Sequence, residues 1–112
     1  MTRHRLPSRR VAETHAIAFN GRAYLVTVGR YEDGRIGEVF ASASKEGSHI
    51  EAMLSNACVL ASLALQHGAS PAEMARSMLR VPAMADAFGS GVAPACPVAA
   101  VVDLLAELEG GA

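Results

Sequence analysis

The order of apolar and polar residues predicts strands in the first part of the chain and helices in the rest. Residues 11–41 contain two dipeptides, Asn20-Gly21 and Asp33-Gly34, that two-residue hairpin turns favour because both turn positions need positive φ angles. The segments around these turns carry alternating side chains of the kind found in half-buried strands. The pattern therefore predicts three antiparallel strands, at about 11–19, 22–30 and 35–42.

The register of this sheet follows if both turns have two residues. The predicted facing pairs are Ile17 with Tyr24, His15 with Val26, and Val28 with Val39. Side-chain alternation then gathers the apolar members of these pairs on one face, which we expect to be buried. His15 lies in the same inward register, where a hydrogen-bonded structural histidine is more common than a ligand or a base.

A long helix is predicted at about 49–67. Ser48 and Glu51 form a capping box at its start, and Gly68 is placed as a left-handed stop at its end. The helix is apolar nearly all round, with one thin polar stripe made of Glu51, Ser55, Ser62 and Gln66. One sheet cannot cover every side of such a helix, so we expect a second helix or a second subunit to pack on it.

Two further helices are predicted, at about 71–80 and 97–108. Ser70 and Pro71 give the first a start signal, and Pro97 opens the second. Residues 81–95 are rich in proline and glycine and are expected to form a loop. The predicted fold is one α+β domain over residues 11–108, a three-stranded antiparallel β-meander packed against two or three α-helices.

Charge changes this picture only at the N-terminus. The chain has 112 residues and a formal net charge of −1, which gives no overall field for nucleic acid or membranes. Five basic residues nevertheless crowd residues 1–10: Arg3, His4, Arg5, Arg9 and Arg10. A solvated basic tail is expected here. Nucleic-acid binding through this tail is a weaker alternative, because no aromatic residues are interleaved with the arginines.

The two cysteines argue against a metal site or a disulfide. Cys58 and Cys96 form no C-x-x-C motif and have no histidine at zinc spacing. We therefore expect no metal, no cofactor, and reduced thiols in a cytoplasmic protein, and no apolar run reaches the length of a membrane span. Cys58 is expected to be a buried, inert thiol. Cys96 precedes a predicted helix, where a lowered pKa is a route to a reactive thiol, although capping or packing is the simpler role.

The start of the long helix is the candidate ligand site. Free N–H groups and a partial positive charge at a helix start favour phosphate or carboxylate. Lys45, Gly47 and Ser48 would supply charge, close backbone approach and a hydroxyl, while four arginines from strand ends could converge there: Arg9, Arg10, Arg30 and Arg35. The alternative is that Ser48 and Glu51 only cap the helix. His49 is expected to be solvated, and His67 to oppose the negative end of the helix.

Several short motifs occur together in a known order: Arg5-Leu6-Pro7, Thr14-His15, Tyr24, Val28-Gly29, Tyr31-Glu32-Asp33-Gly34-Arg35, Gly37-Glu38-Val39-Phe40, Lys45-Glu46-Gly47-Ser48 and Leu63-Ala64-Leu65-Gln66-His67-Gly68. On these the chain resembles the TSCPD-type C-terminal domain of adenosylcobalamin-dependent (class II) ribonucleotide reductases and related free-standing small proteins. Of the Thr-Ser-Cys-Pro-Asp signature only Cys96-Pro97 is present. The resemblance implies the domain fold and a setting in nucleotide metabolism. The radical-generating barrel of those enzymes has no counterpart here, so no catalytic residue carries over.

The expected function is therefore a non-catalytic accessory or binding module that contacts a nucleotide or a partner protein of nucleotide metabolism. No catalytic triad order, P-loop spacing or paired acid and base residues are visible in the sequence. A structural or protein-interaction homo-oligomer without a small-molecule ligand is the alternative from another class. It would assemble through the 49–67 helix or through a sheet edge.

Overall fold

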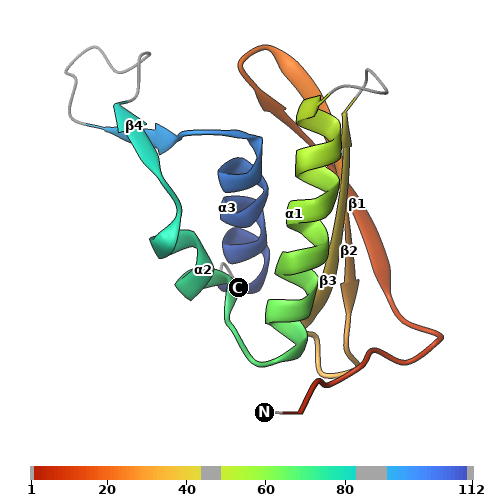
Figure 1. Ribbon diagram of the computed structural model, residues 1–112. Coiled ribbons are helices and arrows are strands. Elements are labelled where there is room, and N and C mark those ends of the chain that lie inside the picture. The colour runs from red at the N-terminus through yellow and green to blue at the C-terminus, as the bar shows by residue number, and fades with distance from the viewer. Residues whose placement is uncertain (1, 44–48, 83–90, 111–112) are drawn as a thin grey trace.

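The computed structural model describes residues 2–43, 49–82 and 91–110. Within these ranges the chain forms a three-stranded antiparallel sheet of order β1-β2-β3, a two-stranded ribbon and three helices (Figure 1). The bounds are β1 Ala12–Phe19, β2 Arg22–Arg30, β3 Ile36–Ala43, α1 His49–Gln66, α2 Pro71–Ser77, β4 Arg80–Pro82, β5 Val92–Pro94 and α3 Pro97–Gly110. The predicted α+β fold is confirmed.

The first hairpin has the predicted turn and register. Asn20 and Gly21 have φ angles of 50° and 76°, as a turn with two left-handed residues requires. Ile17 faces Tyr24 and His15 faces Val26 as predicted. The face that carries Tyr24 and Val26 is buried, with exposed fractions of 3% and 0%.

The second turn differs from the prediction, although the strands beyond it keep the predicted register. Gly34, with a φ of 92°, closes a loop of three residues, since the N–H of Tyr31 donates to the carbonyl of Arg35 at 2.9 Å. The register then shifts at Gly29 and Arg30, which leaves Gly37 as the extra residue of a bulge. The three-residue loop and the bulge offset each other. Val28 therefore still faces Val39, and the prediction of a two-residue turn at Asp33-Gly34 is wrong.

The core lies between the sheet and the pair α1 and α3. Leu54 of α1 and Leu105 of α3 are buried against Val26, Val28 and Val39. The second helix that α1 was expected to need is therefore α3, which stands beside it (Figure 1). Another side of α1 stays at the surface, where three large apolar side chains are 56–69% exposed: Met53, Val59 and Leu60.

Side chains of α1 complete the outer edge of β3. The N–H of Val39 donates to the Ser62 hydroxyl at 2.9 Å, and that hydroxyl reaches the carbonyl of Val39 at 3.2 Å. One turn later along the helix, the Gln66 amide donates to the carbonyl of Gly37 at 3.0 Å. The predicted polar stripe of the helix thus has a structural role, because two of its members replace a neighbouring strand.

The same ladder continues one turn earlier in the helix. The sulfur of Cys58 accepts a hydrogen bond from the backbone N–H of Ala41. Four helical residues rise roughly 6 Å, and two strand residues span roughly 6.6–6.8 Å. Because these two spacings are similar, every fourth residue of the helix can contact every second residue of the strand. The edge of β3 is therefore closed by an antiparallel helix.

The end of α1 is the predicted glycine stop. Gly68 has a φ of 105°, its N–H donates to Leu65, and the N–H of Ala69 donates to Ala64 at 3.0 Å. These two bonds form the paired pattern that satisfies the last carbonyls of a helix. The predicted cap residue Ser48, at the other end, lies outside the described residues.

The segment after α1 contains more regular structure than predicted. Helix α2 ends at Ser77, not at residue 80, and β4 pairs with β5 at either end of the predicted loop. The sequence pattern did not predict this ribbon because each of its strands contains a proline. Proline is nevertheless tolerated at a strand edge where an N–H would face solvent. Arg80 attaches the ribbon to α3 through a bidentate contact with Asp103.

Candidate anion site at the N-terminal corner

The basic segment at residues 2–10 runs across the end of the sheet where β2 leads into β3 (Figure 1). The N–H of His4 donates to the carbonyl of Gln66 at 2.7 Å, and Arg3 donates to the Gln66 side chain. The hydroxyl of Tyr31 donates to the carbonyl of His4. This segment was expected to be a solvated tail. Its residues are exposed except for Leu6, which is half-buried, and these hydrogen bonds also attach it to the rest of the fold. We call the region formed by residues 2–10 and 30–38 the N-terminal corner.

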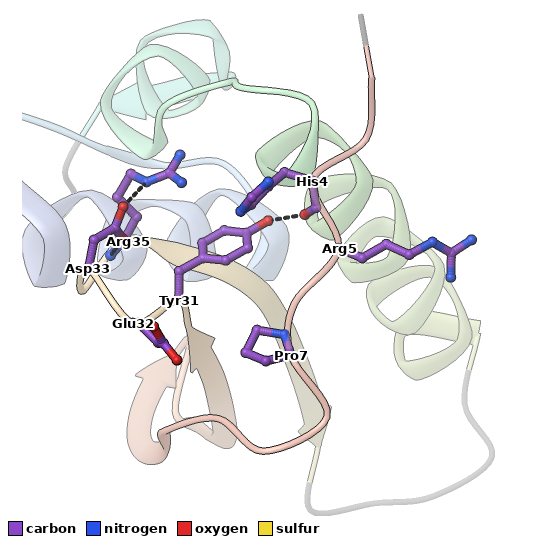
Figure 2. A pocket seen from close by; sticks show the side chains of 7 residues that line it. All are labelled: His4, Arg5, Pro7, Tyr31, Glu32, Asp33 and Arg35. Atoms are coloured by element: carbon purple, nitrogen blue, oxygen red, sulfur yellow. Dashed lines mark hydrogen bonds and ion pairs between the residues drawn. The ribbon is translucent and has the colours of Figure 1, made fainter.

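Tyr31 is the centre of this corner. Tyr31 is 6% exposed. Its ring lies 4.8 Å from the imidazole of His4 between centroids, and the guanidinium of Arg35 lies over it at 4.8 Å (Figure 2). Burial raises the pKa of Tyr31, so the hydroxyl remains a neutral donor to His4. Gly37 provides the space, since a Cβ there would come within 2.6 Å of the tyrosine ring.

Two cavities flank Tyr31. The larger, about 450 Å³, is lined by His4, Arg5, Pro7, Tyr31, Glu32, Asp33 and Arg35 (Figure 2). Within it Arg35 donates to Asp33 at 2.8 Å, so this guanidinium is already neutralised. Backbone and side-chain N–H groups of Arg35 lower the pKa of Asp33, which keeps it ionised.

The smaller cavity, of about 140 Å³, contains three arginines: Arg9, Arg10 and Arg30. Arg10 is held by the carboxylate of Glu38 through two hydrogen bonds. Arg30 donates to Glu13 at 2.6 Å. Arg9 makes no hydrogen bond or ion pair with any described residue. The site therefore has two oriented guanidinium groups and one that is free.

The four predicted arginines meet one another and not the predicted helix start. Arg9, Arg10 and Arg30 share one cavity, and Arg35 lines the next one. They lie at the Ile36 end of β3, whereas α1 begins beyond its other end, a strand length of roughly 25 Å away. Lys45, Gly47 and Ser48 lie outside the described residues, so their proposed role stays a prediction.

The remaining candidates have ordinary surroundings. Cys58 is buried and burial raises its pKa, which fits the predicted inert thiol. Cys96 is exposed at the start of α3, and its carbonyl accepts the N–H of Ala100. The Nε2 atom of His15 lies 3.3 Å from Glu13. The described residues contain no group of three potential metal ligands, and none of their helices has the length and apolar character of a membrane span.

Sequence reasoning missed His4, Arg5, Tyr31, Glu32 and Asp33 as parts of the site. Their signal was present in two motifs of the family resemblance, Arg5-Leu6-Pro7 and the stretch from Tyr31 to Arg35. These motifs are separated by more than twenty residues but line the same cavity. Only the folded chain shows that they belong together.

Comparison with known proteins identifies similar sequences. The TSCPD domain matches residues 2–108, which include the docked N-terminal segment. Vitamin B12-dependent ribonucleotide reductases from Agrobacterium fabrum and Rhodopirellula baltica are each 39% identical over 66 residues, and that from Bradyrhizobium diazoefficiens is 35% identical. The matched region covers 59% of this chain but only 5–6% of each reductase. No solved structure matches the chain.

Proposed function

Because the chain belongs to the TSCPD domain family, we propose that it is a non-catalytic binding module of nucleotide metabolism whose N-terminal corner holds the phosphate groups of a nucleotide. The ligand class rests on the names of the related reductases. Since the chain spans about one-twentieth of their length, the reductase activity itself is not part of the proposal.

The observation that carries this proposal is the free guanidinium of Arg9 beside two guanidinium groups that are already oriented. Arginine binds phosphate through paired N–H donors, and its fixed orientation reduces the entropy lost on binding. The side chain of Arg30 donates to Glu13 and to the carbonyl of Gly34, and a guanidinium offers five N–H groups. Donors therefore remain for a phosphate between Arg9 and Arg30.

Two further charged side chains, Arg5 and Glu32, would change the electrostatic potential around the three arginines. Arg5 has no partner among the described residues, and its side chain extends away from Tyr31 (Figure 2). Arg5 lines the larger cavity and not the smaller one, so it would add a second free cation beside the three arginines. Glu32, which lines both cavities, would repel an anion. We expect Glu32→Gln to tighten phosphate binding, most clearly at low salt, since an exposed charge is screened at higher ionic strength.

Isothermal titration of the intact chain tests the proposal, with ribonucleotides and deoxyribonucleotides as mono-, di- and triphosphates, cyclic nucleotides, and pyrophosphate. Arg9→Ala should weaken the binding of a responding ligand about tenfold or more, because a charged hydrogen bond contributes about 1.5–3 kcal/mol. Arg76→Ala is the matched control, as Arg76 is exposed on α2 and has no partner among the described residues. Absence of heat for every ligand, or equal losses in the two variants, would contradict the proposal.

A second candidate function is a structural homo-oligomer without a small-molecule ligand. It is favoured by the exposed apolar residues Met53, Val59 and Leu60 on α1 and by the outer edge of β1. A stable dimer that binds none of the nucleotides would support this candidate over the first.

A further inference from the structure

The outer edge of β1 presents backbone groups that pair with nothing in the described parts of the chain. The N–H of Arg30 donates to the carbonyl of Val11 at 3.0 Å. This bond determines which residues of β1 direct their backbone groups toward β2. In an antiparallel pair the bonded residues alternate, so every second residue after Val11 also faces β2. The residues between them direct N–H and C=O away from the sheet: Ala12, Thr14, Ala16 and Ala18.

A contact on the outer face of the sheet supports this assignment of inward and outward backbone groups. The hydroxyls of Thr14 and Thr27 lie 3.0 Å apart, as expected for a facing pair whose backbones are not bonded to each other. No hydrogen bond from a described residue reaches the outward groups of β1. β1 also lies on the side of the sheet away from α1 (Figure 1).

The side chains along this edge do not prevent pairing with another strand. Natural edge strands are commonly protected by lysine, proline, a bulge or a covering element. β1 has eight residues, pairs with β2 without a register shift, and contains neither lysine nor proline. Its outward-facing side chains are small and exposed. Such an edge fits an extended backbone as its partner.

We propose that the partner is a second copy of this chain, joined through antiparallel pairing of β1 with β1 about a two-fold axis at Thr14. In this register Ala12 faces Ala16 of the other copy, and Glu13 faces His15 of the other copy. A shift of two residues in one direction would place Glu13 opposite Glu13, and in the other direction His15 opposite His15. Glu13 opposite Glu13 brings like charges together, and His15 opposite His15 offers no carboxylate as a partner. The Thr14 register alone pairs each glutamate with a histidine, so this pattern favours it.

The two members of the selected pair are weakly paired within one copy. The Nε2 atom of His15 is buried and lies 3.3 Å from Oε2 of Glu13, without the geometry of a hydrogen bond. Glu13 bonds Arg30 through Oε1. In the dimer each imidazole would lie opposite a carboxylate of the other copy, and each carboxylate opposite an imidazole.

The assembly would be a closed dimer with a continuous six-stranded sheet. Its two outer strands are the two copies of β3, and α1 already occupies that edge through Ser62 and Gln66. The same surface is used on both copies, so the contact closes on itself and does not propagate. This inference does not depend on nucleotide binding.

Sedimentation equilibrium of the intact chain tests the dimer, with Thr14→Pro and Thr27→Ala as a matched pair. Both variants lose the bond between the two hydroxyls, but only Thr14→Pro removes an outward N–H from the edge. We expect twice the monomer mass for the wild type and for Thr27→Ala, and the monomer mass for Thr14→Pro. A monomeric wild type, or a Thr14→Pro variant that is folded and dimeric, would overturn the proposal.

Disulfide trapping tests the register without relying on the proline variant. On a Cys96→Ser background, Thr14→Cys should form an oxidised dimer, since facing Cα atoms in a bonded pair lie about 5.5 Å apart, within disulfide reach. Ala18→Cys is the control, because the residue opposite it would precede the other copy's β1. Equal trapping at both positions, or trapping at Ala18 alone, would overturn the proposal.

Discussion

The outer edges of β3 and β1 carry the same backbone groups but have different neighbours. At β3, Ser62 of α1 supplies an acceptor and a donor to Val39, and Gln66 supplies a donor to Gly37. At β1 no described residue supplies any. The difference follows from burial, because an edge in contact with a helix loses water and needs protein partners, whereas an edge at the surface retains water until another strand replaces it.

Proline substitutions should separate the two edges most strongly. Ala41 on β3 and Ala16 on β1 are both alanines whose N–H points away from β2, but only Ala41 contacts α1, through Cys58. We expect Ala41→Pro to destabilise the chain by about 3 kcal/mol, since it removes a bond and inserts a ring into a packed contact. Ala16→Pro should cost the monomer less than about 1 kcal/mol, as an edge position open to solvent tolerates proline.

Urea unfolding would measure this difference, at a concentration where every variant sediments as a monomer. Equal losses of unfolding free energy in the two proline variants would show that α1 does not close the edge of β3.

Gln66→Ala should have the next largest effect. Gln66 is 6% exposed, and its side chain joins the carbonyl of Gly37 to Arg3. Its loss leaves a buried carbonyl without a donor, which costs about 1–3 kcal/mol. Thermal unfolding followed by circular dichroism would detect the change. His67→Ala, at the exposed end of the same helix, is the control, and a comparable loss there would point to helix propensity instead.

Ser62→Ala should destabilise the chain by a smaller amount, about 1 kcal/mol, because one hydroxyl serves both the N–H and the carbonyl of Val39. Hydrogen exchange offers a local reading, since the amide of Val39 should exchange faster relative to the amides of β2. Ser55→Ala lies on an exposed side of the same helix and should leave that amide unchanged.

The smallest effect concerns acid at the β1 edge. The hydrogen bond from Arg30 lowers the pKa of Glu13 below its ordinary value of 4.5. The unfolded chain therefore takes up this proton at a higher pH than the folded chain, and stability from Glu13 is lost as pH falls below that value through the folded pKa. Glu13→Gln should be less sensitive to acid across this range in urea unfolding. Since the side chain is one-third exposed, the difference should be small.

Local sequence signals predicted the elements whose causes are local. Asn20-Gly21 fixed the first hairpin and Gly68 the end of α1, because each requires a backbone conformation that few other residues adopt. At Asp33-Gly34 the same kind of signal was misread. The three-residue loop there depends on the bulge at Gly37, which lies four residues after Asp33. The dipeptide alone does not distinguish a two-residue turn from a three-residue loop.

Features that depend on distant partners were not predictable from the pattern. Arg3 and His4 have the composition of a solvated tail, but Gln66, more than sixty residues later, holds both of them in place, and Tyr31 also bonds to His4. The polar stripe of α1 was visible in the sequence, but not the fact that two of its members, Ser62 and Gln66, bond to β3. Likewise the arginines were recognised as candidates, and their meeting place at Tyr31 depended on how the N-terminal segment crosses the sheet.

The closure of β3 by a helix has a consequence for misfolding. A strand at this edge would be held by a full set of backbone hydrogen bonds, whereas α1 can fray without any strand separating. The backbone groups of β3 would then lose their partners, and both edges of the sheet would be open to another strand. In the proposed dimer, a molecule with two open edges would no longer stop at a pair but would add further copies end to end, toward an amyloid-like fibre. The integrity of one helix would thus decide between a finite complex and open-ended aggregation.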